Sequence, residues 1–165
     1  LDELAQGRFQ TVIPEVDPID PAGVERVVFC SGKVYFDLLE ARRARAQTHV
    51  AIIRLEQLYP FPKEAFARAL EPYTHTEEIV WCQEEPQNQG AWDQIKHRFH
   101  TLIQNGKRPH YVGRPASAAP AVGHRAAHVE QHERLIDEAL EKQQLQQAER
   151  AAKQAKGATA SQQST

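Results

Sequence analysis

The feature that most constrains this chain is a regular alternation of short apolar runs with amphipathic helical stripes. The runs have the length of strands and are rich in β-branched residues: Arg26–Cys30, Val50–Leu55, Glu78–Cys82 and His110–Val112. Such runs are typical of strands that are covered on both faces. Helical stripes follow them, with apolar residues at 35–39, 66–70, 91–103 and 129–140. This alternation predicts βαβ units with right-handed crossovers and a mostly parallel sheet.

The predicted fold class is therefore α/β, as a three-layer α/β/α domain over residues 24–141. Residues 1–23 are expected to form a lead-in, with a short strand at Phe9–Ile13 and a stiff connector containing Pro14, Pro18 and Pro21. Residues 142–165 carry Gln, Ala, Lys and Glu with few apolar groups. We predict a frayed helical extension there, followed by disorder.

Composition excludes several classes of protein. The 165 residues carry a formal charge of −2, whereas a nucleic-acid-binding domain would show a strong basic excess. No apolar run approaches the ~20 residues that span a bilayer. The chain contains no Met and no signal-peptide pattern, so we expect its N-terminus to be a cut inside a longer polypeptide. Cys30 and Cys82 each end an apolar run, which predicts two buried thiols in a reducing compartment.

Polar side chains follow each predicted strand. Ligands of open parallel sheets bind beyond the carboxyl ends of the strands. The polar residues at these ends are Ser31, Lys33, Arg54, Glu56, Gln57, Gln83, Glu84, Glu85, Asn88, Gln89, Arg114 and Ser117. One interpretation is a solvated rim of paired charges. The other is a convergent site for an anion or a protein partner.

The turn Ser31–Gly32–Lys33 favours the second interpretation, because it opens a helix whose N–H groups attract anions. Ser31 is predicted to cap that helix. Lys33, Arg54 and Arg114 would add positive charge to a phosphate or carboxylate cradle. The spacing of a P-loop is absent.

Two patterns resemble catalytic or metal sites. Glu84 and Glu85 are adjacent on an extended segment, so their side chains should point to opposite sides, one buried and paired, the other facing solvent. His residues recur at helical spacing, at 97 and 100 and at 124, 128 and 132, but no CxxC accompanies them. Solvated helix faces explain these His residues better than a metal site. With no GxSxG and no dinucleotide fingerprint present, we predict that this segment has no catalytic residues of its own.

The stretch from Gly113 to Gly123 is a long loop of small residues. Small residues allow close backbone approach. Two interpretations stay open for this loop: an ordinary crossover, or a segment that packs under another subunit or over a ligand.

Four long motifs, in order, resemble a known family. They are RVVFCSGKVYFDLLEARR at 26–43, VAIIRLEQLYPFP at 50–62, WCQEEPQNQGAW at 81–92 and GRPASAAPAVG at 113–123. They look like the C-terminal domain of the thiamine-dependent component of the bacterial 2-oxoglutarate dehydrogenase complex. The resemblance runs from about Leu4 to Leu140; the Gln-rich tail lies outside it.

The resemblance implies a transketolase C-terminal-like fold, a five-stranded sheet with Phe9–Ile13 antiparallel to the rest. It implies a cytoplasmic homodimer, thiamine diphosphate and Mg²⁺ bound by other domains, and succinyl transfer from 2-oxoglutarate to a partner succinyltransferase. It also implies a regulatory site for acetyl-CoA or AMP, which we expect at Ser31, Lys33, Arg54, Gln89, Arg114 and Ser117. Pro115 replaces an arginine of some relatives and puts the acetyl-CoA response in doubt. The alternatives are a stand-alone nucleotide or acyl-CoA binding module, and an independent α/β enzyme using Glu84 or Glu85.

Overall fold

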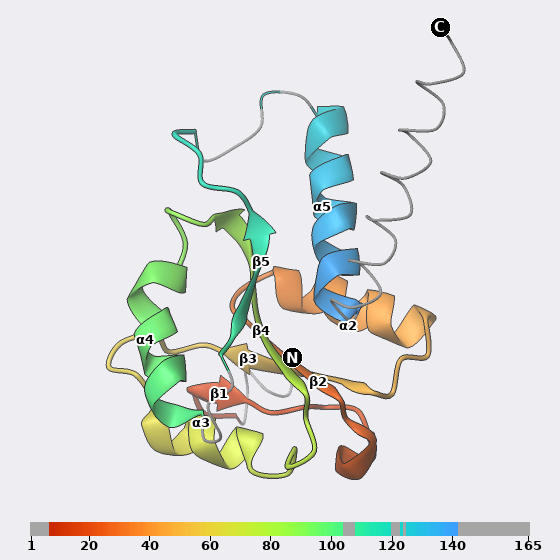
Figure 1. Ribbon diagram of the computed structural model, residues 1–165, viewed down its shortest axis with the longest axis vertical. Helices are drawn as coiled ribbons and strands as arrows, with labels where there is room; N and C mark the ends of the chain where they lie inside the picture. Colours follow the sequence, from red (N-terminus) through yellow and green to blue (C-terminus); the bar gives the residue numbers. More distant parts are fainter. Residues whose placement is uncertain (1–6, 104–107, 120–122, 124, 142–165) are drawn as a thin grey trace, which may run out of the picture.

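The computed structural model describes residues 7–103, 108–119, 123 and 125–141, and it has a five-stranded sheet at its centre (Figure 1). The strand order is β1-β3-β2-β4-β5. The strands are β1 (Val12–Ile13), β2 (Arg26–Cys30), β3 (Val50–Leu55), β4 (Glu78–Pro86) and β5 (His110–Arg114). β1 runs antiparallel to β3, and the other neighbours are parallel. The predicted mixed sheet is confirmed.

Helices cover both faces of this sheet, which confirms the three-layer prediction. They are a short 3-10 turn η1 (Pro21–Gly23), α2 (Val34–Ala44), α3 (Lys63–Leu70), α4 (Trp92–Leu102) and α5 (Arg125–Leu140). One core lies on the side of α3 and α4, and the other on the side of α2 and α5 (Figure 1). Within the described part of the chain, no helix is long and apolar enough to cross a bilayer.

The two cores differ in chemistry. The core under α3 and α4 is aromatic: Phe29 stacks on Phe66 at 4.7 Å, and Phe99 meets Trp81 edge-on at 5.9 Å between ring centroids. The core under α2 and α5 is aliphatic and contains both cysteines. Aromatic pairs contribute about 0.5–1.5 kcal/mol each beyond the area that they bury. The alternation of side chains along each strand divides the apolar residues between these cores.

The expected bounds of β1 and β4 were wrong. β1 is shorter than the predicted Phe9–Ile13, because it pairs only with Arg54 and Leu55 at the end of β3 and leaves Phe9 70% exposed. β4 continues to Pro86, since it stays paired with β5 beyond the apolar run. The predicted helix end at Asn105–Gly106 lies outside the described residues, as does the tail 142–165; the described part of α4 ends at Leu102.

The connector after β1 is bound to the domain by charge. The Arg42 guanidinium, 2% exposed, pairs with Glu15 and lies 2.5 Å from the Asp17 carboxylate. Glu15 also accepts a hydrogen bond of 2.8 Å from the backbone N–H of Ile52. Charge-assisted bonds of this kind are stronger than neutral ones. The Pro-rich segment therefore follows a defined path beside β3 and α2.

Candidate functional site

The carboxyl ends of the four parallel strands meet at one edge of the sheet. Cys30 of β2 is in register with Arg54 of β3 and with Cys82 of β4, and Cys82 is in register with Val112 of β5. This edge, with the turns that follow β2 and β4 and the loop that follows β5, is called the strand-end rim below. The strand-end residues predicted from the sequence therefore gather at one edge of the domain.

Arg54, Glu84 and Arg114 lie on the α2–α5 face of this rim. Arg54 packs on aromatic residues of α2, while Glu84 and Arg114 line one cavity with residues of α5. Side chains two residues apart on a strand point to the same face, and this parity agrees with the position of Val80 and Cys82 in the aliphatic core. The rim is thus covered from one side by α2 and α5.

Lys33 begins a row of charged groups across this face. Its ammonium lies 2.6 Å from the Asp37 carboxylate, which raises the pKa of Lys33 through their hydrogen bond. Nε2 of His132 lies 3.4 Å from the same Asp37 carboxylate, and Nδ1 of His132 lies 3.9 Å from Glu84. A row of polar groups thus runs from α2 across α5 to β4, with the imidazole of His132 between the two carboxylates. Asp37 was not among the residues predicted for the site, although its position four residues after Lys33 is the spacing of a helical ion pair.

Ser31 does not cap α2, so that prediction was wrong. Lys33 occupies the N-cap position in a helical conformation and makes no side-chain capping hydrogen bond. The cause is the turn itself: Gly32 has a φ of +76°, a value that favours glycine, and this places Ser31 two residues ahead of the cap. The helix opening is present at the rim, but without the serine at its cap.

Arg54 is occupied by its own surroundings. Its guanidinium carbon lies 4.6 Å from the ring centroid of Tyr35 and 5.2 Å from that of Phe36, both on α2. Nε of Arg54 lies 2.8 Å from the Glu56 carboxylate. A desolvated cation–π contact contributes roughly 1–2 kcal/mol. Arg54 therefore holds α2 against β3, and its charge is already balanced.

Arg114 lies where β5 meets α5. Its Nε donates to the side-chain oxygen of Gln131 at 3.1 Å. Together with Glu84, His128, Gln131, His132 and Leu135 it lines a cavity of about 40 Å³. A volume of that size holds about one water molecule, so a nucleotide would have to lie across the surface of the rim.

Gln89 and Ser117 are brought together directly. The Gln89 amide donates to the Ser117 carbonyl at 2.7 Å, and Asn88 both donates to that carbonyl and accepts from the Ser117 N–H, at 3.1 and 3.0 Å. The turn after β4 therefore holds the loop after β5. Of the residues predicted for the site, Ser31 and Lys33 share one turn, and Gln89 and Ser117 are hydrogen-bonded to each other from two different segments. Arg54 and Arg114 contact different helices, α2 and α5.

Gly113, where the predicted loop of small residues was expected to begin, lies inside β5 and does permit close backbone approach. A Cβ on Gly113 would lie 2.4 Å from the hydroxyl oxygen of Tyr111 and 2.8 Å from the Gln83 carbonyl. The Tyr111 hydroxyl donates to the Arg114 carbonyl at 2.9 Å, and burial raises the pKa of Tyr111 to about 12. Residues 120–122 and 124 lie outside the described residues, and they include His124 of the helical His pattern.

Gln83, expected among the rim residues, is instead an internal support. Its side-chain oxygen accepts from Nε1 of Trp81 at 2.9 Å and from the N–H of Trp92, the first residue of α4, at 3.1 Å. Its amide donates to the Pro86 carbonyl at 3.1 Å. The side chain is 2% exposed and lies inside β4. Gln83 thus closes the start of α4, a role that its position in the sequence did not reveal.

The two adjacent glutamates and the two cysteines lie in different environments. Glu84 is half-buried and Glu85 is exposed, so they do not share a site, although Glu84 is less buried than we expected. Cys30 and Cys82 are buried as free thiols on neighbouring strands, and desolvation raises the pKa of both. Raised pKa values disfavour the reactive thiolate.

A solved structure with the same arrangement of helices and strands defines the class of fold. A split gene transketolase chain, from an inactive beta4 tetramer, superposes with a TM-score of 0.56 over 81% of this chain and 44% of that chain, at 14% sequence identity. At that identity the likeness shows the fold alone. The domain has a transketolase-like α/β fold.

The sequence identifies the family. The model of the family described as 2-oxoglutarate dehydrogenase C-terminal matches residues 1–140. The 2-oxoglutarate dehydrogenase E1 component of Haemophilus influenzae is 59% identical over 140 residues, and that of Azotobacter vinelandii is 51% identical over 143 residues. This chain belongs to the 2-oxoglutarate dehydrogenase C-terminal family. The matches cover 85% of this chain but 15% of each relative's length.

Proposed function

We propose that this chain is the structural and regulatory C-terminal domain of a thiamine-dependent 2-oxoglutarate dehydrogenase. The observation that carries the proposal is the family match across residues 1–140, supported by 59% identity to an E1 component. In this proposal the full polypeptide works in the bacterial cytoplasm. It decarboxylates 2-oxoglutarate and passes the succinyl group to a partner succinyltransferase in a multienzyme complex.

Thiamine diphosphate and Mg²⁺ belong, in this proposal, to the rest of the polypeptide. A diphosphate–magnesium unit needs converging polar groups that are shielded from bulk water. In the part of the chain that the structure describes, the buried polar side chains are Arg26, Arg42, Thr76 and Gln83, and each is bonded within the domain. These residues therefore do not fit the cofactor, which supports a non-catalytic role for the segment.

The test compares the full-length polypeptide with this chain alone. Each is assayed with 2-oxoglutarate, thiamine diphosphate, Mg²⁺ and an artificial electron acceptor. We expect turnover from the full-length polypeptide and none from this chain, provided that a cooperative thermal transition shows the chain to be folded. Turnover by this chain would refute the non-catalytic assignment, and an inactive full-length polypeptide would refute the activity itself.

We further propose that the strand-end rim binds a phosphate-bearing effector such as AMP or acetyl-CoA. The support is the opening of α2 at Lys33, whose side chain is 71% exposed, together with Gln89, Ser117 and Arg114 at the ends of β4 and β5 on the same rim. Ser31 completes the turn. Arg54 would act only by holding α2, because it already pairs with Glu56.

Calorimetric titration of the full-length polypeptide with AMP and with acetyl-CoA tests the effector site. We expect Lys33→Glu to weaken binding at least tenfold, since a phosphate contact becomes a repulsion. Glu71→Lys, a charge reversal on an exposed residue just after α3, serves as the control and should leave affinity unchanged. Equal affinities in the wild type and in Lys33→Glu would contradict this site.

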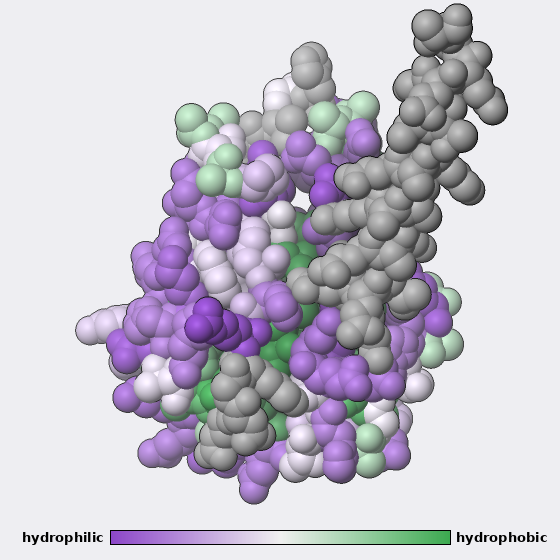
Figure 2. Space-filling view, in the orientation of Figure 1, coloured by the Kyte–Doolittle hydropathy of each residue, from purple (hydrophilic) through white to green (hydrophobic). Residues whose placement is uncertain are grey.

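The proposed homodimer would use the surface of this domain together with domains outside this chain. β5 is an edge strand of the sheet, and Figure 2 shows apolar atoms along the middle of this face, between the polar surfaces of α4 and α5. Large apolar side chains are also exposed at Phe9, Val16, Phe36, Tyr59 and Val129. A contiguous apolar patch, as along β5, commonly marks an interface, whereas single exposed apolar side chains do not. Light scattering on the full-length polypeptide would give its oligomeric state directly.

A further inference from the structure

Three potential metal ligands converge on the α2–α5 face of the strand-end rim. Asp37 comes from α2, Glu84 from β4 and His132 from α5. One ligand atom from each residue lies within 4.8 Å of the others. Their side chains are 28%, 35% and 26% exposed, so the group is half-buried and open to solvent on one side. This group is called the rim triad below.

The spacing of the rim triad suits a metal ion better than a set of direct hydrogen bonds. The contacts of His132 with Asp37 and Glu84, at 3.4 and 3.9 Å, are longer than the 2.7–3.2 Å of a usual N–H···O hydrogen bond. Two ligands at about 2.1 Å from a tetrahedral zinc ion lie about 3.4 Å from each other. The Asp37–His132 distance, measured from Nε2, already matches that value, whereas the 3.9 Å contact of Glu84 is to Nδ1 of the same ring. An ion bound at one nitrogen therefore needs the carboxylate beside the other nitrogen to move toward it, and one ligand atom of each residue already lies within 4.8 Å of the others.

The chemistry of the three ligands selects the class of ion. One imidazole nitrogen and two carboxylates carry a formal charge of −2 when the imidazole is neutral, which balances a divalent cation. Mg²⁺ and Ca²⁺ prefer oxygen ligands alone, whereas Zn²⁺ and its first-row neighbours bind imidazole together with carboxylate. Three protein ligands leave a fourth position for water on the open side.

Lys33 is the group that an ion would displace. Its ammonium lies 2.6 Å from the Asp37 oxygen that faces His132, and its side chain is 71% exposed. A flexible lysine can rotate into water at small cost, because an exposed ion pair contributes only about 0–1 kcal/mol. The pair is therefore a competitor for the site and not a permanent block.

We propose that Asp37, Glu84 and His132 form a binding site for a divalent transition-metal ion of the Zn²⁺ class. The ion would join α2, β4 and α5 at the rim. α5 is fixed near its C-terminal end by Arg26, which donates to the carbonyls of Glu138 and Ala139. The metal would fix the half of α5 that lies toward the rim. This proposal does not rest on the proposed 2-oxoglutarate activity, but the site shares Lys33 with the proposed effector site.

The test uses the full-length polypeptide after removal of metal with a chelator. Zn²⁺ is titrated by calorimetry into the wild type, into His132→Gln and into a control, His100→Gln, which changes an exposed His on α4. We expect the wild type and the control to bind one more Zn²⁺ ion per polypeptide than His132→Gln does. Comparing variants in this way subtracts Zn²⁺ that binds elsewhere in the polypeptide.

Two further measurements locate the ion. Lys33→Ala removes the competing ammonium and should tighten Zn²⁺ binding several-fold, and anomalous diffraction at the zinc edge should place a peak among the three residues. Melting temperatures in chelator show whether His132→Gln is folded, and Glu84→Gln provides a second loss-of-ligand variant. Equal Zn²⁺ stoichiometry in the wild type and in both folded variants, or a peak elsewhere only, would overturn the proposal.

Discussion

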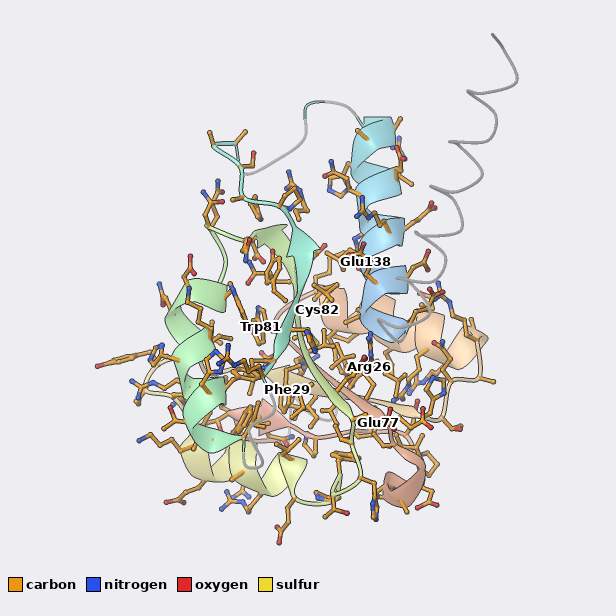
Figure 3. All side chains as sticks on the ribbon, viewed as in Figure 1. Arg26, Phe29, Glu77, Trp81, Cys82 and Glu138 are labelled. Carbon is orange, nitrogen blue, oxygen red and sulfur yellow. The ribbon has the colours of Figure 1, made fainter. Side chains whose placement is uncertain are left out.

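The two ends of the parallel sheet use their arginines and lysines differently. At the amino end, Arg26 is 1% exposed, pairs with Glu78 and donates at 2.9 and 2.8 Å to the last carbonyls of α5 (Figure 3). At the carboxyl end, Lys33 is 71% exposed and pairs with Asp37. A buried cation must be fully paired, whereas an exposed one can exchange its partner for water or a ligand. The arginine at the amino end thus contributes to stability, whereas Lys33 at the carboxyl end is free to exchange its partner, unlike Arg54 beside it, which is held by Glu56 and two aromatic rings.

Arg42 shows the same use of charge at the amino end of β3. It donates to the Val50 carbonyl at 3.0 Å while pairing with Glu15 and Asp17. This single side chain joins the connector, α2 and the start of β3. At this end of the sheet charged residues hold the elements together, because they donate hydrogen bonds to backbone carbonyls and carboxylates that would otherwise be buried unpaired.

The largest effect should come from breaking the buried pair at the amino end. Arg26→Met leaves Glu78 and the carbonyls of α5 without their donor. We expect a loss of about 3–5 kcal/mol in the free energy of unfolding, as found for half-removed buried ion pairs. Urea denaturation measures it, with Arg114→Met at the rim as the matched control, expected to lose less than about 1 kcal/mol. Similar losses in both variants would remove the contrast between the two ends.

Gln83 is buried like Arg26 but lies at the carboxyl end of the sheet. Its substitution therefore tests whether burial or position in the sheet decides how much unfolding free energy is lost. Gln83→Ala leaves the Trp81 indole N–H and the first N–H of α4 without an acceptor. Each buried unsatisfied donor costs about 1–3 kcal/mol, so we expect a loss of about 2–4 kcal/mol by urea denaturation. The exposed Gln89→Ala should lose less than about 0.5 kcal/mol. A Gln83 variant as stable as the Gln89 variant would show that these bonds contribute nothing.

Asp17 in the connector should contribute to stability at neutral pH and lose that contribution in acid. Hydrogen bonding from Arg43, with further help from Arg42, lowers the pKa of Asp17 from 3.8 to about 2. A lowered folded-state pKa stabilises the protein above pH 3.8, and that contribution is lost as the pH falls toward 2. We expect the wild type to lose about 1 kcal/mol more than Asp17→Asn between pH 5 and pH 2.5, after allowance for screening. Urea denaturation at both pH values measures the loss. An equal loss of unfolding free energy in the wild type and in Asp17→Asn would contradict this prediction.

The smallest effect on stability is expected at the rim. Lys33→Ala removes an exposed ion pair and should change the free energy of unfolding by less than about 0.5 kcal/mol. The same variant should alter ligand binding at the rim, which separates a functional charge from a structural one. A loss above 1 kcal/mol, measured by thermal and urea denaturation, would place Lys33 with the amino-end residues instead.

The pattern of apolar residues alone determined the layers, the parallel strands and the edge at which polar groups collect. Runs such as Arg26–Cys30 need cover on both faces, and stripes such as 129–140 supply it, so local periodicity is enough to specify the architecture. The family motifs added the antiparallel β1. The gathering of Lys33, Arg54 and Arg114 at one rim follows from the same topology.

Only the tertiary structure decided which charges are free and which are bound. Gln83 and Glu84 are neighbours in sequence, yet they have different partners. Gln83 is buried and accepts a hydrogen bond from the first N–H of α4. Glu84 faces His132, which lies on α5, 48 residues further along the chain. The sequence predicts the same role for Arg54 and Lys33, as positive charges for an anion, but the structure places the Arg54 guanidinium over the rings of Tyr35 and Phe36. Burial follows from local patterns, but the energy of a charge depends on partners that the fold brings from distant positions.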